Sequence, residues 1–113
     1  MKIACAQINP VIADIRGNTA KIIGSISEAK KSGAEMVVFP ELSVIGYPPM
    51  DLLEHEKLVA DNIDAISVIA PHADGIAVIC GYVDRDPSRS PALLNAAAVM
   101  FDGSTTAQTY FDW

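Results

Sequence analysis

The chain contains 113 residues, which is enough for a single domain. Eight basic and fourteen acidic residues give a formal net charge of −6, which disfavours nucleic acid or an anionic membrane as a partner. Half of the residues are hydrophobic and 19% are charged, which excludes a disordered chain. No apolar run approaches the roughly 20 residues of a membrane span, and two cysteines make no disulfide framework. We therefore expect a cytoplasmic protein.

The first 40 residues have the pattern of a strand, a helix and a second strand. Residues 2–8 form a short apolar run without alternation, which is typical of a strand buried on both faces. Asn18 can cap a helix over residues 18–32, in which apolar side chains recur every three or four positions, and Gly33 ends it. Residues 36–39 form the next buried strand. This order predicts two parallel strands joined by a helical crossover.

The rest of the chain alternates in the same way after a proline-rich loop. The pattern predicts a helix at 57–70 and strands at 75–82, 93–101 and 105–110. Asp102-Gly103 is a strong hairpin signal, so the last strand should return antiparallel.

The predicted fold class is α/β, with two helices on one side of about five strands. The other sheet face then has no cover from within the sequence, and a single layer does not close a core. We expect that face to pack against a missing half of the domain or a second copy of the chain.

Glu41 is the strongest candidate for a catalytic residue. It follows directly on the carboxyl end of a predicted buried strand, where α/β sheets bind ligands. Phe39 and Leu42 can desolvate its carboxylate, as a general base requires. The alternative is an ordinary solvated glutamate at a strand end.

Tyr47 and Asn95 are further candidates near this strand end. Tyr47 lies between Gly46 and Pro48, where a restrained aromatic side chain suits either the wall of a substrate pocket or a packing anchor for the loop. Asn95 lies within an apolar strand, and we expect it to satisfy backbone groups near the site.

The other residues that carry chemistry favour structural roles. Cys5 and Cys80 lie among aliphatic residues and are expected to be buried core thiols. His55 and His72 are expected at the surface. The acidic residues at 51–56 suit a helix N-terminus better than a metal site.

The sequence resembles the nitrilase, or carbon–nitrogen hydrolase, superfamily. More narrowly, it resembles the start of the glutaminase domain found in glutamine-dependent NAD synthetases. The resemblance runs from about Met1 to Gly103. The motifs that carry it are Ala6-Gln7-Ile8-Asn9-Pro10, Gly17-Asn18, Val37-Val38-Phe39-Pro40-Glu41-Leu42, Gly46-Tyr47-Pro48-Pro49, Asp51-Leu52-Leu53 and Leu94-Asn95-Ala96-Ala97-Ala98-Val99.

The resemblance implies a Glu–Lys–Cys triad, in which cysteine attacks an amide, glutamate is the general base and lysine stabilises the oxyanion. Only the glutamate carries over, onto Glu41. Asp112 stands where the lysine is expected, and no lysine follows Lys57. We therefore expect residues 1–113 to be a partial domain that stops before the catalytic lysine and cysteine and is inactive alone.

The resemblance implies the first half of an αββα sandwich, from a domain that hydrolyses glutamine and supplies ammonia for NAD biosynthesis. It also implies no cofactor in this chain, because ATP and Mg²⁺ would bind a separate synthetase domain. Two alternatives remain. One is a fragment of another amidase or carbamoylase of the superfamily, and the other is a non-catalytic interaction module.

Overall fold

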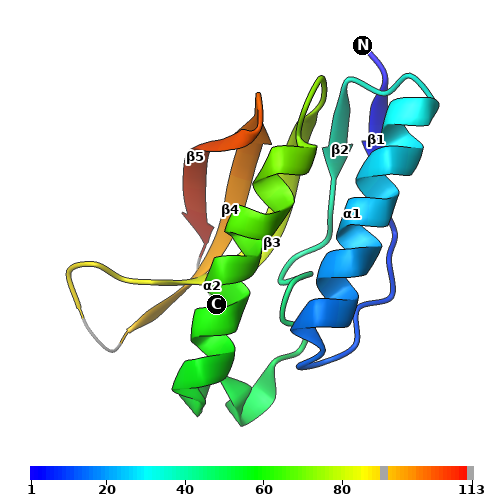
Figure 1. Cartoon of the computed structure of the whole chain (residues 1–113). Coiled ribbons are helices and arrows are strands. Elements are labelled where there is room, and N and C mark those ends of the chain that lie inside the picture. The colour runs from blue at the N-terminus through cyan, green and yellow to red at the C-terminus, as the bar shows by residue number, and fades with distance from the viewer. Residues whose placement is uncertain (90–91, 112–113) are drawn as a thin grey trace.

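The computed structural model describes residues 1–89 and 92–111 and contains one five-stranded sheet with two helices on one face (Figure 1). The α/β fold class predicted from the sequence is confirmed. No helix within these ranges is both long and apolar enough to cross a membrane. In chain order the elements are β1 (Ile3–Cys5), α1 (Ile15–Lys31), β2 (Met36–Val38), the 3-10 helix Met50–Glu54, α2 (Glu56–Ile69), the 3-10 helix Ala70–His72, β3 (Ala77–Arg85), β4 (Leu93–Phe101) and β5 (Ser104–Phe111).

The strands lie side by side in the order in which they occur in the chain. The pairs β1–β2 and β2–β3 are parallel, as the strand–helix–strand pattern predicts, while β3–β4 and β4–β5 are antiparallel. Asp102 and Gly103 join the last two strands with φ angles of +51° and +79°. Two consecutive positive φ angles are what a tight hairpin needs, so this turn signal is confirmed.

Helix α1 begins three residues earlier than the sequence indicates. Its N-cap is Asp14, whose Oδ1 accepts a hydrogen bond from the Gly17 backbone N–H at 3.0 Å. Asn18, the predicted cap, instead lies inside the helix and is fully buried. The helix ends as expected, with Gly33 at φ +79°.

The prediction of a first strand over residues 2–8, buried on both faces, is wrong. Strand β1 covers only Ile3–Cys5 and lies at the edge of the sheet. Ala4 packs against the core beneath the helices, whereas Ile3 and Cys5 are exposed on the opposite face. An apolar run without alternation predicts burial on two faces, but here one of those faces has no covering layer.

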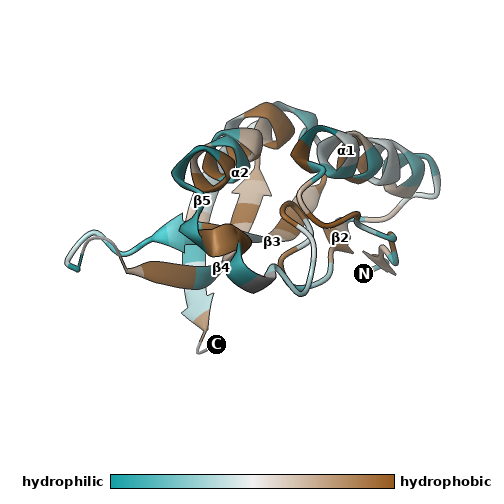
Figure 2. Cartoon of the chain, turned by 90° about the horizontal axis from the view of Figure 1, so that it is seen from below, coloured by the Kyte–Doolittle hydropathy of each residue, from teal (hydrophilic) through white to brown (hydrophobic). Residues whose placement is uncertain are grey.

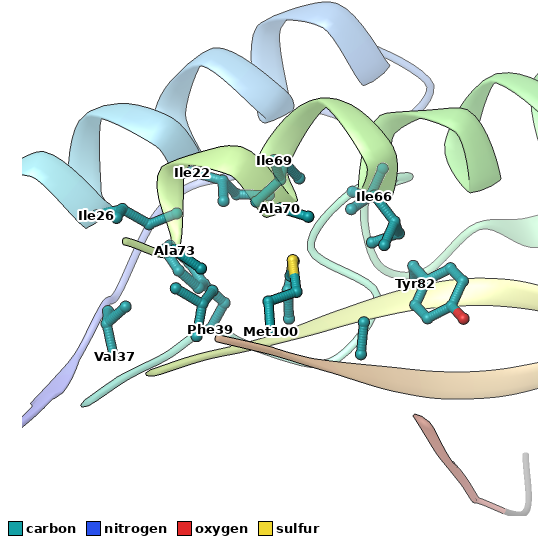
Figure 3. Packing of buried hydrophobic residues seen from close by; sticks show 14 of the residues in the cluster. Ile22, Ile26, Val37, Phe39, Ile66, Ile69, Ala70, Ala73, Tyr82 and Met100 are labelled. Carbon is teal, nitrogen blue, oxygen red and sulfur yellow. The ribbon is translucent and has the colours of Figure 1, made fainter. Parts of the chain in front are cut away.

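The hydrophobic core lies between the helices and the sheet (Figures 2 and 3). Ile22 and Ile26 of α1 and Ile69 of α2 meet side chains that project from one face of the strands. The strand residues on this face alternate along each strand, as the pleat requires. They are Val37, Val78, Cys80, Tyr82, Ala96, Ala98 and Met100.

The other face of the sheet is largely uncovered within the described ranges, as Figure 2 shows. Strand alternation places a mostly apolar set of side chains there: Ile3, Cys5, Met36, Val38, Ala77, Ile79, Ala97, Val99 and Phe111. Ile3 and Phe111 are 53% and 54% exposed. The uncovered face that the sequence predicts is therefore present.

Candidate active site

The chain leaves the sheet for four residues, 40–43, one residue after the end of β2. The Phe39 backbone N–H donates to the Ile79 carbonyl at 2.9 Å, and the Val44 N–H donates to the Gly81 carbonyl at 3.3 Å. Residues 40–43 bulge out between these two bonds. The Ser43 hydroxyl donates to the Pro40 carbonyl at 2.8 Å and closes the bulge. Glu41 therefore stands on a short arch over β3.

Gly81 lets this arch approach the sheet. A Cβ atom at Gly81 would lie 2.6 Å from the Leu42 nitrogen and 2.7 Å from the Pro40 carbonyl oxygen. Both atoms belong to backbone, so they cannot rotate out of the way. The absence of a side chain at Gly81 is therefore what allows Glu41 to sit directly above the strand.

The carboxylate of Glu41 borders a hollow of about 310 Å³ on the uncovered face of the sheet. Asn95 of β4 donates a hydrogen bond from its Nδ2 to the Glu41 Oε1. Asn95 is 2% exposed, whereas Glu41 is exposed. The remaining lining is mostly apolar and comprises Val38, Phe39, Pro40, Ile79, Gly81, Ala96, Ala97 and Phe111. Glu41 and Asn95 thus provide the polar side chains of an otherwise apolar hollow.

Phe39 and Leu42 do not enclose the carboxylate as the sequence analysis expects. Phe39 packs into the main core beneath the helices (Figure 3). Leu42, at φ +49°, packs into a second cluster with Ile45, Val59 and Val83. Leu42 points away from the glutamate and Phe39 contributes only to the wall of the hollow, so neither side chain encloses Glu41, which is exposed.

The loop after the arch is held against α1. Nδ2 of Asn18 donates to the Val44 carbonyl at 2.9 Å, and Gly46, at φ +92°, passes so close to Ile12 that a Cβ there would lie 2.7 Å from the Ile12 Cα. Tyr47 follows at 61% exposure and is not among the residues lining the hollow beside Glu41. Its assignment to a substrate pocket stays a prediction.

The two cysteines have different surroundings. Cys80 is fully buried, as predicted, and burial raises the pKa of its thiol to about 12, partly offset by a contact with the Ser43 hydroxyl. Cys5 is exposed on the uncovered face, so the prediction of a core thiol is wrong there. A buried thiol that stays protonated is a poor nucleophile.

Thiol labelling should therefore separate the two cysteines. With excess dithionitrobenzoate at pH 8, we expect one thiol of the native chain to react within minutes and the second to react only after denaturation. The variant Cys5→Ser should abolish the fast reaction, and Cys80→Ser should leave it intact. Fast reaction of Cys80 in the native chain would contradict its burial.

His55 and His72 are exposed, as predicted. No group of three or more metal-ligating side chains occurs in the part of the chain that the structure describes, and residues 51–56 cover most of a 3-10 helix and the start of α2. Asp112, which stands where the family's lysine is expected, lies outside the described residues.

Comparison with known proteins identifies the family. Residues 2–111 match the carbon-nitrogen hydrolase family. The chain belongs to this family. It is 35% identical, over 91% of its length, to the glutamine-dependent NAD(+) synthetase of Thermotoga maritima. The resemblance noted in the sequence is thereby confirmed.

Solved structures show the same fold. The chain superposes on the glutamine-dependent NAD+ synthetase of Acinetobacter baumannii with a TM-score of 0.86 and 36% identity over 96% of this chain. An amidase from Nesterenkonia sp. matches with a TM-score of 0.81 at 22% identity, which shows likeness of fold alone. The chain spans only 18% of the Thermotoga protein and 20% of the Acinetobacter chain.

The partner of Asn95 and the role of Gly81 are not evident from the sequence. Asn95 was expected to bond backbone groups, but its partner is the Glu41 carboxylate, 54 residues away in the chain. Nothing in the sequence around Gly81 reveals which segment crosses the strand there. A lone amide within the apolar run 93–101 was the available signal for Asn95, and it indicated a buried partner without saying which one.

Proposed function

We propose that this chain supplies the catalytic glutamate of a glutamine-hydrolysing amidase site whose ammonia is used for NAD synthesis. The observation that carries the proposal is the position of Glu41, which lies on an arch after β2, borders the hollow and accepts a hydrogen bond from Asn95. The similarity to glutamine-dependent NAD synthetases over nearly the whole chain supports this substrate class.

In this proposal Glu41 acts as general base. Its carboxylate takes the proton of a cysteine thiol while the sulfur attacks the amide carbon of glutamine, and gives that proton to the nitrogen as the carbon–nitrogen bond breaks and ammonia leaves. The carboxylate then takes a proton from the water that attacks the thioester and returns it to the sulfur as glutamate is released. A lysine stabilises the negative oxygen of each tetrahedral intermediate. Cys80 is a buried thiol, Cys5 is not among the residues that line the hollow beside Glu41, and no lysine follows Lys57, so in this proposal both partners come from outside residues 1–113.

The uncovered face gives these partners a place. Packing the rest of such a domain on the apolar face would bury Ile3, Val38 and Phe111 and close the hollow above Glu41. A second copy of the chain is the alternative cover. ATP and Mg²⁺ belong, in this proposal, to a separate synthetase domain and not to this chain.

A different amide is the second candidate substrate. Membership of the carbon-nitrogen hydrolase family supports it, since a glutamate that borders a mostly apolar hollow can serve any substrate whose carbon–nitrogen bond lies over that hollow. The rates at which one active enzyme hydrolyses glutamine and short aliphatic amides distinguish these two substrate classes.

A chimeric synthetase that carries residues 1–111 of this chain, called the graft, tests the role of Glu41. Residues 1–111 replace the corresponding segment of the Acinetobacter baumannii synthetase, and glutamate release from glutamine is measured. We expect the graft to hydrolyse glutamine and the Glu41→Gln graft to lose at least about 10³-fold in kcat, because removal of a general base costs this order. The 113-residue chain alone should show no turnover.

The matched control is Glu28→Gln on the exposed side of α1, which should leave kcat unchanged. Full activity of the Glu41→Gln graft, or turnover by the isolated chain, would contradict the proposal. Preference of the active graft for aliphatic amides over glutamine would favour the second candidate.

A further inference from the structure

We propose that Asn95 is a positioning residue that fixes the carboxylate of Glu41 for proton transfer. This inference rests on the proposed function of Glu41. The two side chains come from different elements, the arch after β2 and the interior strand β4, and they are joined by the hydrogen bond from Nδ2 of Asn95 to Oε1 of Glu41.

The surroundings of Asn95 require such a partner. Asn95 is 2% exposed and is followed in β4 by three buried alanines, Ala96, Ala97 and Ala98. A buried amide is costly in an apolar environment unless it is hydrogen-bonded. Its bond to Glu41 therefore explains why a polar residue occupies this strand position.

Asn95 is held by the sheet and Glu41 is not, so Asn95 is the residue that orients the other. Asn95 lies between two hydrogen-bonded neighbours, since β4 pairs it with Val83 of β3 on one side and with Phe111 of β5 on the other. Glu41 is exposed and stands on a loop. The strand residue is thus fixed by the sheet, and the loop residue takes its orientation from it.

The chemistry of the amide suits a base. A neutral N–H donor holds Oε1 without contributing a positive charge that would neutralise the carboxylate, and it leaves Oε2 available to take a proton from above the hollow. A residue that holds Glu41 in this way acts through it, because its Nδ2 is bonded to the carboxylate. Its loss should therefore lower kcat and leave KM unchanged.

Two independent measurements test this role. In the graft, Asn95→Asp keeps the shape of the side chain but replaces the donor with an acceptor, and we expect kcat to fall about a hundredfold with KM within about twofold. In the 113-residue chain, Asn95→Asp places two carboxylates together, so its melting temperature at pH 7 should fall by about 5–15 °C.

The double variant Glu41→Gln/Asn95→Asp exchanges donor and acceptor, so it should regain at least half of the melting temperature that Asn95→Asp loses. The matched control is Asn62→Asp, a buried asparagine that bonds the Val83 backbone, and Glu41→Gln should not rescue it. The inference is overturned if the double variant recovers none of the lost melting temperature. It is also overturned if the Asn95→Asp graft has an unchanged kcat, or a raised KM at constant kcat. If recovery occurs but the Glu41→Gln graft is fully active, the contact stands, while the proposed function and the positioning role both fail.

Discussion

Substitution of Gly81 with alanine should destabilise the chain by about 3 kcal/mol, since inserting a methyl group into packed structure costs about 1–3 kcal/mol and this one meets backbone. The added Cβ would lie 2.6 Å from the Leu42 nitrogen and 3.1 Å from the Glu41 carbonyl carbon. These close contacts are relieved only if the arch formed by residues 40–43 moves away from β3. That movement carries Glu41 away from Asn95, so in the graft the same substitution should lower glutamine hydrolysis about a hundredfold.

Gly24→Ala is the matched control. Gly24 lies within α1, and a Cβ there meets nothing within 4 Å. Alanine at an open helical position should stabilise the chain by about 0.5–1 kcal/mol. Urea unfolding of both variants checks the pair. Equal stability of the Gly81→Ala and unsubstituted chains would show that the arch can move without cost, and that Gly81 does not set the position of Glu41.

The features that the sequence predicted correctly depend on neighbouring residues. Apolar periodicity indicates α1 and α2, and Asp102-Gly103 indicates the last hairpin, because a few adjacent side chains decide each of them. The position of Glu41 was predicted for the same reason, since a strand followed directly by a carboxylate places that group at the edge of a sheet.

The features that the sequence could not predict depend on segments far apart in the chain. The direction of Leu42 is set by the arch over Gly81, about 40 residues away. The partner of Asn95 is 54 residues distant, and Asn18 bonds Val44 across 26 residues. No local pattern states which buried polar group will meet which, so these residue types signal a need for a partner and nothing more.

Asn18→Ala should cost about 3 kcal/mol, because it removes the three hydrogen bonds of a fully buried side chain, each worth about 1 kcal/mol, and takes away the donor that bonds the buried Val44 carbonyl. Its Oδ1 accepts from the Val11 N–H at 2.8 Å, and its Nδ2 donates to the carbonyls of Val11 at 2.8 Å and Val44 at 2.9 Å. This one amide ties the loop before α1 to the loop that follows Glu41. Loss of the cap residue in Asp14→Ala should cost only about 1 kcal/mol.

The variant Asn18→Asp separates the contribution of the hydrogen bonds from that of the volume that the side chain fills. The aspartate has the same shape and keeps an acceptor for the Val11 N–H, but it sets a carboxylate oxygen against two carbonyl oxygens where the amide donated. It should therefore destabilise at least as much as alanine in urea unfolding, although it fills the space. The exposed Asn9→Ala serves as control and should change stability by less than about 0.5 kcal/mol. A harmless Asn18→Asp would mean that packing, and not the three hydrogen bonds, holds the loop after Glu41 in place.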